Sequence, residues 1–254
     1  MRLEGNTVLV TGGASGIGRG LAIAMAGAGN RVIIAGRRTD ALRAVADGRP
    51  GIEFLPLDVS DTECVEEFVT RLDRDHPDLN VVINNAGVMA IEDLTTLDPA
   101  RTAEIVATNL LGPILLTSLL IPRLRSRAHS AVINVTSALA FVPMATAPTY
   151  CATKAGLHSF TESLRFQLRD SVIQVIEVVP PRVRTDMVGP TDDRAIDLDA
   201  FIAEVISALA NPHVTEIVVG AARGLRYAER DGAYDQQLVA VNDRVPPAEL
   251  ENMS

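Results

Sequence analysis

Short apolar runs separated by amphipathic helical patterns repeat along the whole 254-residue chain. The runs are continuous and rich in β-branched residues, which is typical of strands buried on both faces of a parallel sheet. Seven runs fit this description: residues 7–10, 31–35, 52–57, 81–83, 131–135, 172–179 and 216–219. Seven strands alternating with helices predict an α/β protein with a doubly wound sheet and helices on both faces.

The segments between these runs have the i, i+3, i+4, i+7 apolar spacing of amphipathic helices. Residues 65–72 and 202–209 each place four apolar side chains on one helix face. Asp61 is positioned to cap the first of these helices, and a further helix is predicted over residues 147–168. The longest apolar run, residues 110–121, is shorter than the ~20 residues that a membrane span needs, so we expect a buried helix there.

No linker, repeat or low-complexity segment interrupts the pattern, so we expect one catalytic domain over residues 1–242. Residues 243–254 are polar and contain two prolines, and we expect them to form a mobile tail. The net charge of −9 argues against a nucleic-acid or anionic-membrane partner. The two cysteines have no disulfide or metal-ligand spacing and the N-terminus has no signal-peptide pattern, which favours a cytoplasmic protein.

A glycine-rich turn directly follows the first predicted strand. Gly12 permits a tight turn, while Gly16 and Gly18 let the backbone approach a pyrophosphate and let the next helix pack closely. The N-terminus of that helix would offer free N–H groups to phosphates. An ordinary glycine-rich turn is the alternative, but the position in a βαβ unit favours nucleotide binding. The expected contacts come from Gly12, Ser15, Gly16, Ile17 and Gly18.

The end of the second strand indicates which nucleotide is bound. An NAD site usually has an acidic residue about 20 residues past the glycines, but Gly36 stands there, followed by Arg37 and Arg38. A guanidinium binds a 2′-phosphate that a carboxylate would repel, so NADP(H) is favoured over NAD(H). The alternative is that both arginines are solvated surface charges. Asp58 and Val59 are placed to contact the adenine, although Asp58 also suits a helix cap.

A second group of residues carries proton-transfer chemistry. A phenol has a pKa near 10, and Lys154 lies one helical turn after Tyr150, where its ammonium would stabilise the phenolate. Ser137 follows a strand and can donate a hydrogen bond to a carbonyl oxygen of the substrate. Asn109 lies in a predicted helix, where a buried amide needs a partner. Holding a water near Lys154 would satisfy it.

The chain resembles the short-chain dehydrogenase/reductase superfamily over essentially its whole length. The matching segments are residues 11–18, 58–59, 84–87, 109, 137, 150–154 and 180–185. The resemblance implies a seven-stranded parallel Rossmann fold and a catalytic tetrad, here Asn109, Ser137, Tyr150 and Lys154. It also implies a homodimer or homotetramer in which the helices of Asn109 and Tyr150 pair with their symmetry mates.

The same resemblance implies further contacts with the cofactor. Residues beside the adenosine ribose and the middle of the cofactor would be Asn85, Ala86 and Gly87. Residues at the nicotinamide end would be Tyr150, Lys154, Pro180, Val183 and Thr185. The chain departs from the family where Pro181 replaces the usual glycine, as in a little-characterised bacterial subgroup with a Pro-Pro-x-Val-x-Thr-Asp motif.

The predicted pocket is apolar, and only about a dozen residues separate Thr185 from the next helix, which would give a short lid. Its expected lining is Met89, Leu139, Phe141, Met144 and Met187. These features predict an NADPH-dependent oxidoreductase that reduces a small or medium uncharged aldehyde or ketone reversibly. The alternatives are an NAD-dependent alcohol dehydrogenase on the same scaffold and a nucleotide-sensing protein without turnover. The four histidines have no ligand spacing, so we expect no metal.

Overall fold

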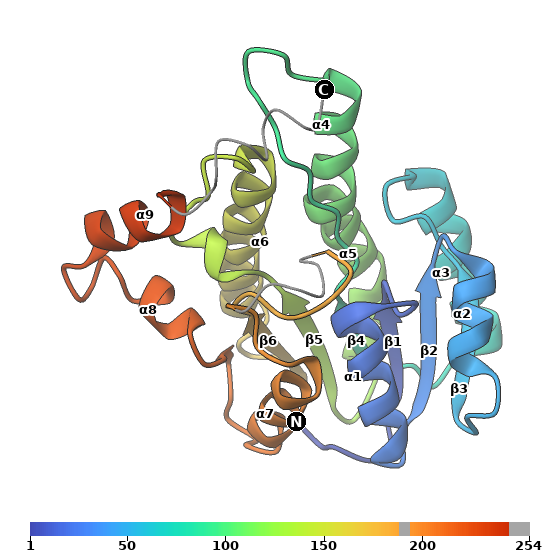
Figure 1. The fold of residues 1–254 in the computed structure, drawn as a ribbon. Helices are drawn as coiled ribbons and strands as arrows, with labels where there is room; N and C mark the ends of the chain where they lie inside the picture. The colour runs from blue at the N-terminus through green and yellow to red at the C-terminus, as the bar shows by residue number, and fades with distance from the viewer. Residues whose placement is uncertain (188–193, 244–254) are drawn as a thin grey trace.

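The computed structural model describes residues 1–187 and 194–243, and one parallel sheet crosses its centre (Figure 1). The seven strands lie in the order β3-β2-β1-β4-β5-β6-β7. They are β1 (Thr7–Thr11), β2 (Arg31–Gly36), β3 (Ile52–Pro56), β4 (Val81–Asn84), β5 (Ser130–Val135), β6 (Ile173–Val179) and β7 (Glu216–Val218). Each predicted run is a strand, with ends that differ by at most one residue. The predicted doubly wound Rossmann fold is therefore confirmed.

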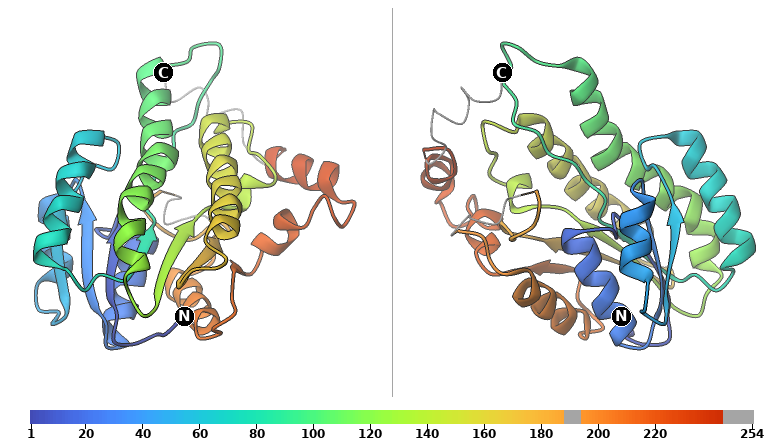
Figure 2. Two further views of the ribbon diagram at one scale, coloured as in Figure 1. Left: turned by 180° about the vertical axis from the view of Figure 1, so that it is seen from behind. Right: turned by 45° about the vertical axis from the view of Figure 1, so that its right-hand side comes forward.

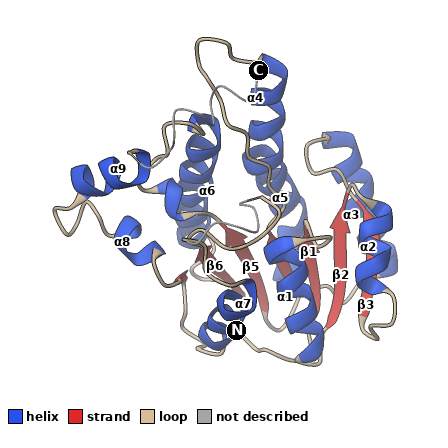
Figure 3. Ribbon diagram, viewed as in Figure 1, coloured by secondary structure: helices blue, strands red, loops and turns tan. Residues whose placement is uncertain are grey.

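Two layers of helices cover the sheet, as the two further views in Figure 2 and the colouring in Figure 3 show. One face is covered by α1 (Gly16–Gly27), α2 (Thr39–Ala46) and α7 (Leu198–Leu209). The opposite face is covered by α3 (Thr62–Asp75), α5 (Gly112–Arg125) and α6 (Pro148–Gln167). Helix α4 (Pro99–Val106) leads through a π-helical turn into α5. Helices α8 (Ala222–Arg226) and α9 (Tyr234–Asn242) lie outside the sheet, beyond its β7 edge.

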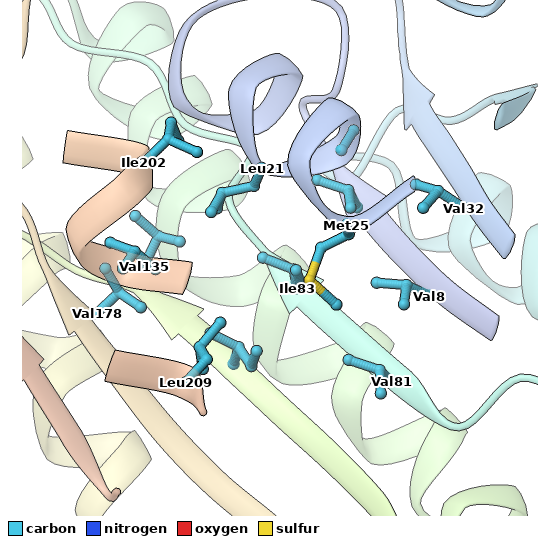
Figure 4. Packing of buried hydrophobic residues seen from close by; sticks show 14 of the residues in the cluster. Val8, Leu21, Met25, Val32, Val81, Ile83, Val135, Val178, Ile202 and Leu209 are labelled. Carbon is cyan, nitrogen blue, oxygen red and sulfur yellow. The ribbon is translucent and has the colours of Figure 1, made fainter. Parts of the chain in front are cut away.

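The strands bury both of their faces, because successive side chains of a strand point in opposite directions. Val8 and Val10 pack with α1 and α7, whereas Leu9 between them packs with α3 and α5. Figure 4 shows Leu21 and Met25 of α1 above the strands of the first face. Burial of each such side chain contributes about 1.5–3 kcal/mol. The carboxyl ends of the strands are thereby held as a rigid platform for the site.

The predicted cap of α3 is confirmed, because the Asp61 carboxylate accepts a hydrogen bond from the Cys64 N–H at 3.1 Å. The apolar run at residues 110–121 belongs to a longer helix, Pro99–Arg125, than its sequence indicated. This helix is long and apolar enough to cross a membrane by length and composition alone, and 44% of its most apolar window is buried inside the protein. A single helix of this kind is weak evidence for a membrane span, since core helices of soluble proteins can have the same length and composition. The predicted tail lies outside the described residues, apart from Asp243.

Candidate active site

A cleft of about 380 Å³ opens at the carboxyl ends of the strands, where the strand order reverses about β1. Open α/β sheets bind ligands at such a switch point. The predicted site residues that line the cleft are Gly12, Ser15, Gly16, Ile17, Arg37, Arg38, Asp58, Val59, Asn85, Ala86, Gly87, Ser137, Tyr150, Lys154, Pro180, Val183 and Thr185. Gly18 and Asn109 do not line it, because both are buried behind it.

The glycine turn has the backbone conformation that its sequence requires. Gly12 and Gly16 have φ values of +68° and +53°, in the left-handed region that glycine adopts readily. Helix α1 begins here without a side-chain cap and without an acidic residue in its first turn, so its first N–H groups remain available to a ligand. A Cβ atom on Gly16 would lie 3.3 Å from Cγ2 of Thr185, which shows how closely the turn and Thr185 face each other. This arrangement fits a phosphate group.

Gly18 serves packing rather than ligand contact. A Cβ atom on Gly18 would lie 2.4 Å from the Asn85 amide nitrogen and from the Gly12 carbonyl oxygen. The Asn85 amide in turn donates to the Thr11 carbonyl oxygen at 3.0 Å, and the Thr11 hydroxyl accepts from the backbone N–H of Asn85 at 3.0 Å. The Asn85 side chain therefore holds the glycine turn in place, while its backbone faces the cleft.

The two arginines that follow β2 line the cleft and have different partners. The Arg38 guanidinium donates to the Ser15 hydroxyl at 2.7 Å, which places its charge beside the glycine turn. The Arg37 guanidinium donates to the Glu104 carboxylate at 3.1 Å and lies 4.0 Å from the Asp58 carboxylate. Arg38 is thus placed to bind a phosphate, whereas the charge of Arg37 is already neutralised by carboxylates.

Asp58 does not cap α3, because Asp61 does so. The Asp58 carboxylate instead accepts hydrogen bonds from the backbone N–H and the hydroxyl of Ser60, at 3.0 and 2.6 Å. Burial acts to raise the pKa of Asp58, but the Ser60 hydrogen bonds and the charge of Arg37 outweigh it and lower the pKa. Asp58 therefore contributes a negative charge to the adenosine end.

Tyr150 and Lys154 are buried in the opposite end of the cleft, on consecutive turns of α6. Burial raises the pKa of Tyr150 to about 12, although a hydrogen bond with the Ser137 side chain acts in the opposite direction. The Lys154 ammonium donates to the Val135 carbonyl oxygen at 2.9 Å, and burial lowers the pKa of Lys154 to about 8. At neutral pH the site therefore holds a neutral phenol beside an ammonium group, which is the protonation state that a general acid needs.

The expected stabilisation of a Tyr150 phenolate by Lys154 is not visible in the protein alone. The Lys154 ammonium lies 5.7 Å from the centroid of the Tyr150 ring, and the effect of burial on the pKa of Tyr150 is the larger one. The sequence contains no lysine other than Lys154. Its resonance and its chemical reactivity can therefore be followed without overlap from other lysines.

Asn109 lies in a π-helical turn, Ala107–Leu111, between α4 and α5. Its amide is fully buried, accepts from the Val88 N–H at 2.8 Å and donates to the Val88 carbonyl oxygen at 2.8 Å. A Cβ atom on Gly87 would lie 3.3 Å from the Asn109 amide oxygen and 3.6 Å from the Lys154 ammonium. The partners of the amide are thus the chain after β4 and the Thr153 hydroxyl of α6, to which the Asn109 nitrogen donates at 3.2 Å. Such π-helical turns are frequent at functional sites.

Tyr150 packs in a small apolar cluster. Met144 and Cys151 are buried with Tyr150, and Met89 and Leu139 pack against them. Met187 lines the cleft and is half exposed. Met89, Leu139, Phe141 and Met144 were also predicted to line the pocket, but the cleft lining does not include them. The ring of Phe141 lies edge-on to His158, with ring centroids 4.7 Å apart. Val241 of α9 also packs against this cluster, and no sequence signal had indicated it.

Two more residues that the sequence did not reveal hold the segment between Ser137 and Tyr150. The Glu92 carboxylate accepts from the Thr149 N–H at 3.0 Å, in the first turn of α6. The Asn242 amide oxygen accepts from the Ala145 N–H at 2.6 Å, and its nitrogen donates to the Pro143 carbonyl oxygen at 3.1 Å. Both come from distant parts of the chain, so no local pattern relates them to the site.

The parallel sheet, the glycine turn at its switch point and the Ser137, Tyr150 and Lys154 cluster at the strand ends define a Rossmann-type oxidoreductase. The family model described as short chain dehydrogenase matches residues 6–195. The chain belongs to this family.

Known relatives agree with this classification. The uncharacterized oxidoreductase DltE of Bacillus subtilis (strain 168) is 36% identical over 250 residues, which cover 95% of this chain and 98% of that protein. The NADP-dependent 3-hydroxy acid dehydrogenase of Schizosaccharomyces pombe is 31% identical over 192 residues, covering 73% of this chain and 74% of that protein. A short chain dehydrogenase from Burkholderia cenocepacia J2315, solved in complex with NADP, superposes with a TM-score of 0.82. It has 28% identity, over 97% of this chain and 100% of that one.

Proposed function

We propose that this protein is an NADPH-dependent reductase of small or medium uncharged aldehydes and ketones, and that the reaction is reversible. One observation carries the proposal: a buried, protonated Tyr150 lies with Ser137 in the same cleft as the uncapped N-terminus of α1. The NADP bound to the Burkholderia relative supports the choice of cofactor. The family as a whole acts on small-molecule substrates.

The residues present fit a dinucleotide. The N-terminus of α1 and the glycine turn would hold the diphosphate, Asp58 and Val59 would contact the adenosine, and Val183 and Thr185 would hold the nicotinamide amide. NADPH, when bound, supplies the hydride for the reaction. The uncapped N-terminus of α1, which opens into the cleft, is the feature that most directly supports binding of an anion.

The chain itself supplies the proton. The Ser137 hydroxyl can donate to the substrate carbonyl oxygen, and the Tyr150 hydroxyl delivers its proton to that oxygen as the alcohol forms. The Ser137 hydrogen bond lowers the pKa of Tyr150 and so helps to stabilise the phenolate that forms. We infer that the Lys154 ammonium, 5.7 Å from the ring centroid, adds to this as the negative charge develops. In the reverse direction Tyr150 takes the alcohol proton back. Asn109 contributes by holding the backbone at Val88, beside the cleft.

One observation favours the NAD-dependent alternative. Arg37 is held by the carboxylates of Glu104 and Asp58, and acidic groups at this end of the cleft suit a ribose hydroxyl better than a phosphate. Arg38 has no carboxylate among its contacts in the described structure and lies on Ser15. The balance between the two cofactors should therefore depend on Arg38.

The structure predicts that Arg38→Ala discriminates between the cofactors more strongly than Arg37→Ala does. Loss of a hydrogen bond to a charged group costs about 1.5–3 kcal/mol, so the Kd for NADPH should rise ~10- to 100-fold in Arg38→Ala, with little change for NADH. Arg37→Ala is the matched control and should weaken NADPH less. Fluorescence titration with NADPH and with NADH measures the Kd of each cofactor for the wild type and for both variants. Equal losses for NADPH and NADH in Arg38→Ala would contradict a role in binding the 2′-phosphate.

Neutral substrates should be preferred to charged ones. Asp186 and Met187 line the substrate end of the cleft, and Lys154 is the cation that the described lining contributes there. A carboxylate would lose its hydration without gaining a partner. We expect neutral aldehydes and ketones to have higher kcat/KM values than keto acids of the same carbon skeleton. One of the relatives is a 3-hydroxy acid dehydrogenase, so keto acids are an informative comparison. A higher kcat/KM for the keto acids would contradict the proposal of an apolar pocket.

The quaternary structure and the location of the protein are also proposals. Helices α5 and α6 leave apolar side chains exposed, with Leu119 at 36% and Phe166 at 69% exposure, and Leu111 in the turn before α5 is 56% exposed. Such a face suits a homodimer or homotetramer, which sedimentation at micromolar concentration would distinguish from a monomer. Both cysteines are free thiols, which fits the predicted cytoplasmic setting.

A further inference from the structure

A row of polar side chains crosses four strands of the sheet in register, beneath the helices that carry the site. Parallel strands buried on both faces normally present apolar residues to their helices. The row consists of Asn84 on β4, Asn134 on β5, Glu177 on β6 and Glu216 on β7, each paired with the next. The first three are at most 3% exposed. Buried polar groups of this kind are normally hydrogen-bonded; in this row the amide oxygen of Asn84 has no hydrogen-bond partner within the described residues.

Each member of the row has a polar partner on a neighbouring helix. The partners are Thr117 for Asn84, Thr161 for Asn134, His158 for Glu177 and Arg226 for Glu216. The Glu177–His158 pair stands out because it places an ionisable carboxylate in the core. The side chain of Glu177 is 1% exposed and that of His158 is 18% exposed. An uncompensated charge there would be strongly destabilising.

The His158 ring contacts both carboxylate oxygens of Glu177. The Nδ1 atom of His158 lies 2.9 and 3.0 Å from the two oxygens of Glu177. The Glu177 hydrogen bond raises the pKa of His158 against the effect of burial, Glu162 raises it further and Arg226 lowers it. The contact with Glu177 therefore favours the protonated, ion-paired form of His158 at this junction between α6 and β6.

The ion pair is joined to the end of β5 through Thr136. The Thr136 hydroxyl donates to a Glu177 oxygen at 2.7 Å. Its two neighbours in sequence contact the catalytic groups: the Val135 carbonyl oxygen accepts from Lys154 at 2.9 Å, and Ser137 hydrogen-bonds Tyr150. Movement of Thr136 would thus disturb both catalytic contacts together.

On the helix side, His158 is in line with the two catalytic residues of α6. His158 is four residues after Lys154, and Lys154 is four residues after Tyr150, so the three side chains lie on one face of α6. Residues 135–137 and this helix face are therefore held together at three successive points. The contact farthest along α6 from its N-terminus is the one among His158, Glu177 and Thr136, and it takes no part in the chemistry.

We propose that His158 and Glu177 are positioning residues for the reaction, which fix α6 against the end of β5 so that Lys154 and Ser137 keep their places. The proposal rests on the proposed function for its kinetic consequence but not for its structural one. The side chains of His158, Glu177 and Glu216 also lie close enough to share a cation, with their ligand atoms within 4.8 Å of one another. His158 and Arg226 already balance the two carboxylates, so the ion-pair network is the better account.

The single lysine of this chain permits a test that does not depend on activity. Protein labelled with ¹³C in lysine gives one side-chain resonance, whose titration midpoint should be about 8 in the wild type. If the pair holds α6 against β5, both His158→Gln and Glu177→Gln should admit water to Lys154 and raise its midpoint toward 10.5. A direct charge effect would instead shift the Lys154 midpoint in opposite directions. His158→Gln removes the positive charge of the protonated histidine, whereas Glu177→Gln removes a negative charge.

Matched variants keep the result interpretable. Glu162→Gln also changes a neighbour of His158, at 3.7 Å and 57% exposed, and should leave the midpoint unchanged. Thr136→Val removes the hydrogen bond to Glu177 together with a weaker one to the Val178 carbonyl oxygen, and it serves if Glu177→Gln does not fold. In kinetic assays His158→Gln and Glu177→Gln should lower kcat about 10- to 100-fold, as a small misplacement does, with NADPH affinity retained.

Three results would overturn the proposal. The first is an unmoved midpoint in His158→Gln, Glu177→Gln and Thr136→Val, and the second is shifts of opposite sign for the two ion-pair variants. The third is a high-affinity site for added Zn²⁺ that either of the ion-pair variants abolishes, since the cluster would then be a metal site. Failure of the proposed function is a separate observation, because it means that the wild type itself reduces no carbonyl with NADPH.

Discussion

Tyr150→Phe should lower kcat for carbonyl reduction by ~10²–10⁴-fold, the usual contribution of a positioned general acid. The substitution removes the hydroxyl that bonds Ser137 and keeps the ring that packs with Met144 and Cys151. The protein should therefore fold and bind NADPH as the wild type does. Steady-state kinetics at saturating NADPH, with the cofactor Kd measured separately, tests both parts.

Ser137→Ala is the matched comparison for this variant. It removes a donor to the carbonyl oxygen but leaves the acid in place, so kcat should fall less than in Tyr150→Phe. It should also raise the pKa of Tyr150 further, since the Ser137 hydrogen bond opposes the effect of burial. Near wild-type turnover in Tyr150→Phe would remove the assignment of Tyr150 as the acid.

Lys154→Met should cost ~10²–10³-fold in kcat, comparable to the loss of a preorganised donor beside a developing oxyanion. The substitution removes the ammonium near Tyr150 and its bond to the Val135 carbonyl oxygen, while keeping most of the side-chain volume. Because Lys154 also faces the cleft, NADPH affinity should fall as well. The expected signature is a combined loss in kcat and cofactor Kd, in contrast to Tyr150→Phe, which loses kcat alone.

The pH dependence of the wild type provides an independent check on Lys154. A lysine with a lowered pKa is charged below that value and loses its proton as the pH rises through it. The kcat/KM for reduction should therefore be level at neutral pH and fall above pH about 8. Tyr150, with a pKa of about 12, stays protonated over that interval. A level profile across this pH range would contradict the role of the ammonium.

The strands and the two halves of the site were predictable because local patterns encode them. A β-branched run buried on both faces has few alternatives, and Gly12 and Gly16 occupy positions where only glycine adopts the required φ without strain. The four-residue spacing of Tyr150 and Lys154 places both on one helix face wherever α6 lies. These features survive in any tertiary context.

Other features depend on tertiary contacts that no local pattern encodes. Asn109 was identified, but its π-helical turn and its pairing with residue 88 come from packing against the chain after β4. Phe141 follows Ser137 as a pocket residue would, yet the ring is held by His158 and by the Arg226 guanidinium, 4.4 Å above it. His158 itself has no distinctive spacing, and its importance arises only when β6 brings Glu177 beneath it.

The central claim is that this cleft transfers a hydride from NADPH to a carbonyl carbon. A direct test uses NADPH that carries deuterium in place of one or the other of the two hydrogens on C4 of its dihydronicotinamide ring. Each labelled cofactor is supplied with a panel of neutral aldehydes and ketones, and the alcohols are analysed by mass spectrometry. We expect deuterium at the former carbonyl carbon from one of the two labelled cofactors, and almost no product with Tyr150→Phe. NADPH that binds and stabilises the protein while no substrate yields labelled alcohol would contradict the account and favour a nucleotide-sensing protein.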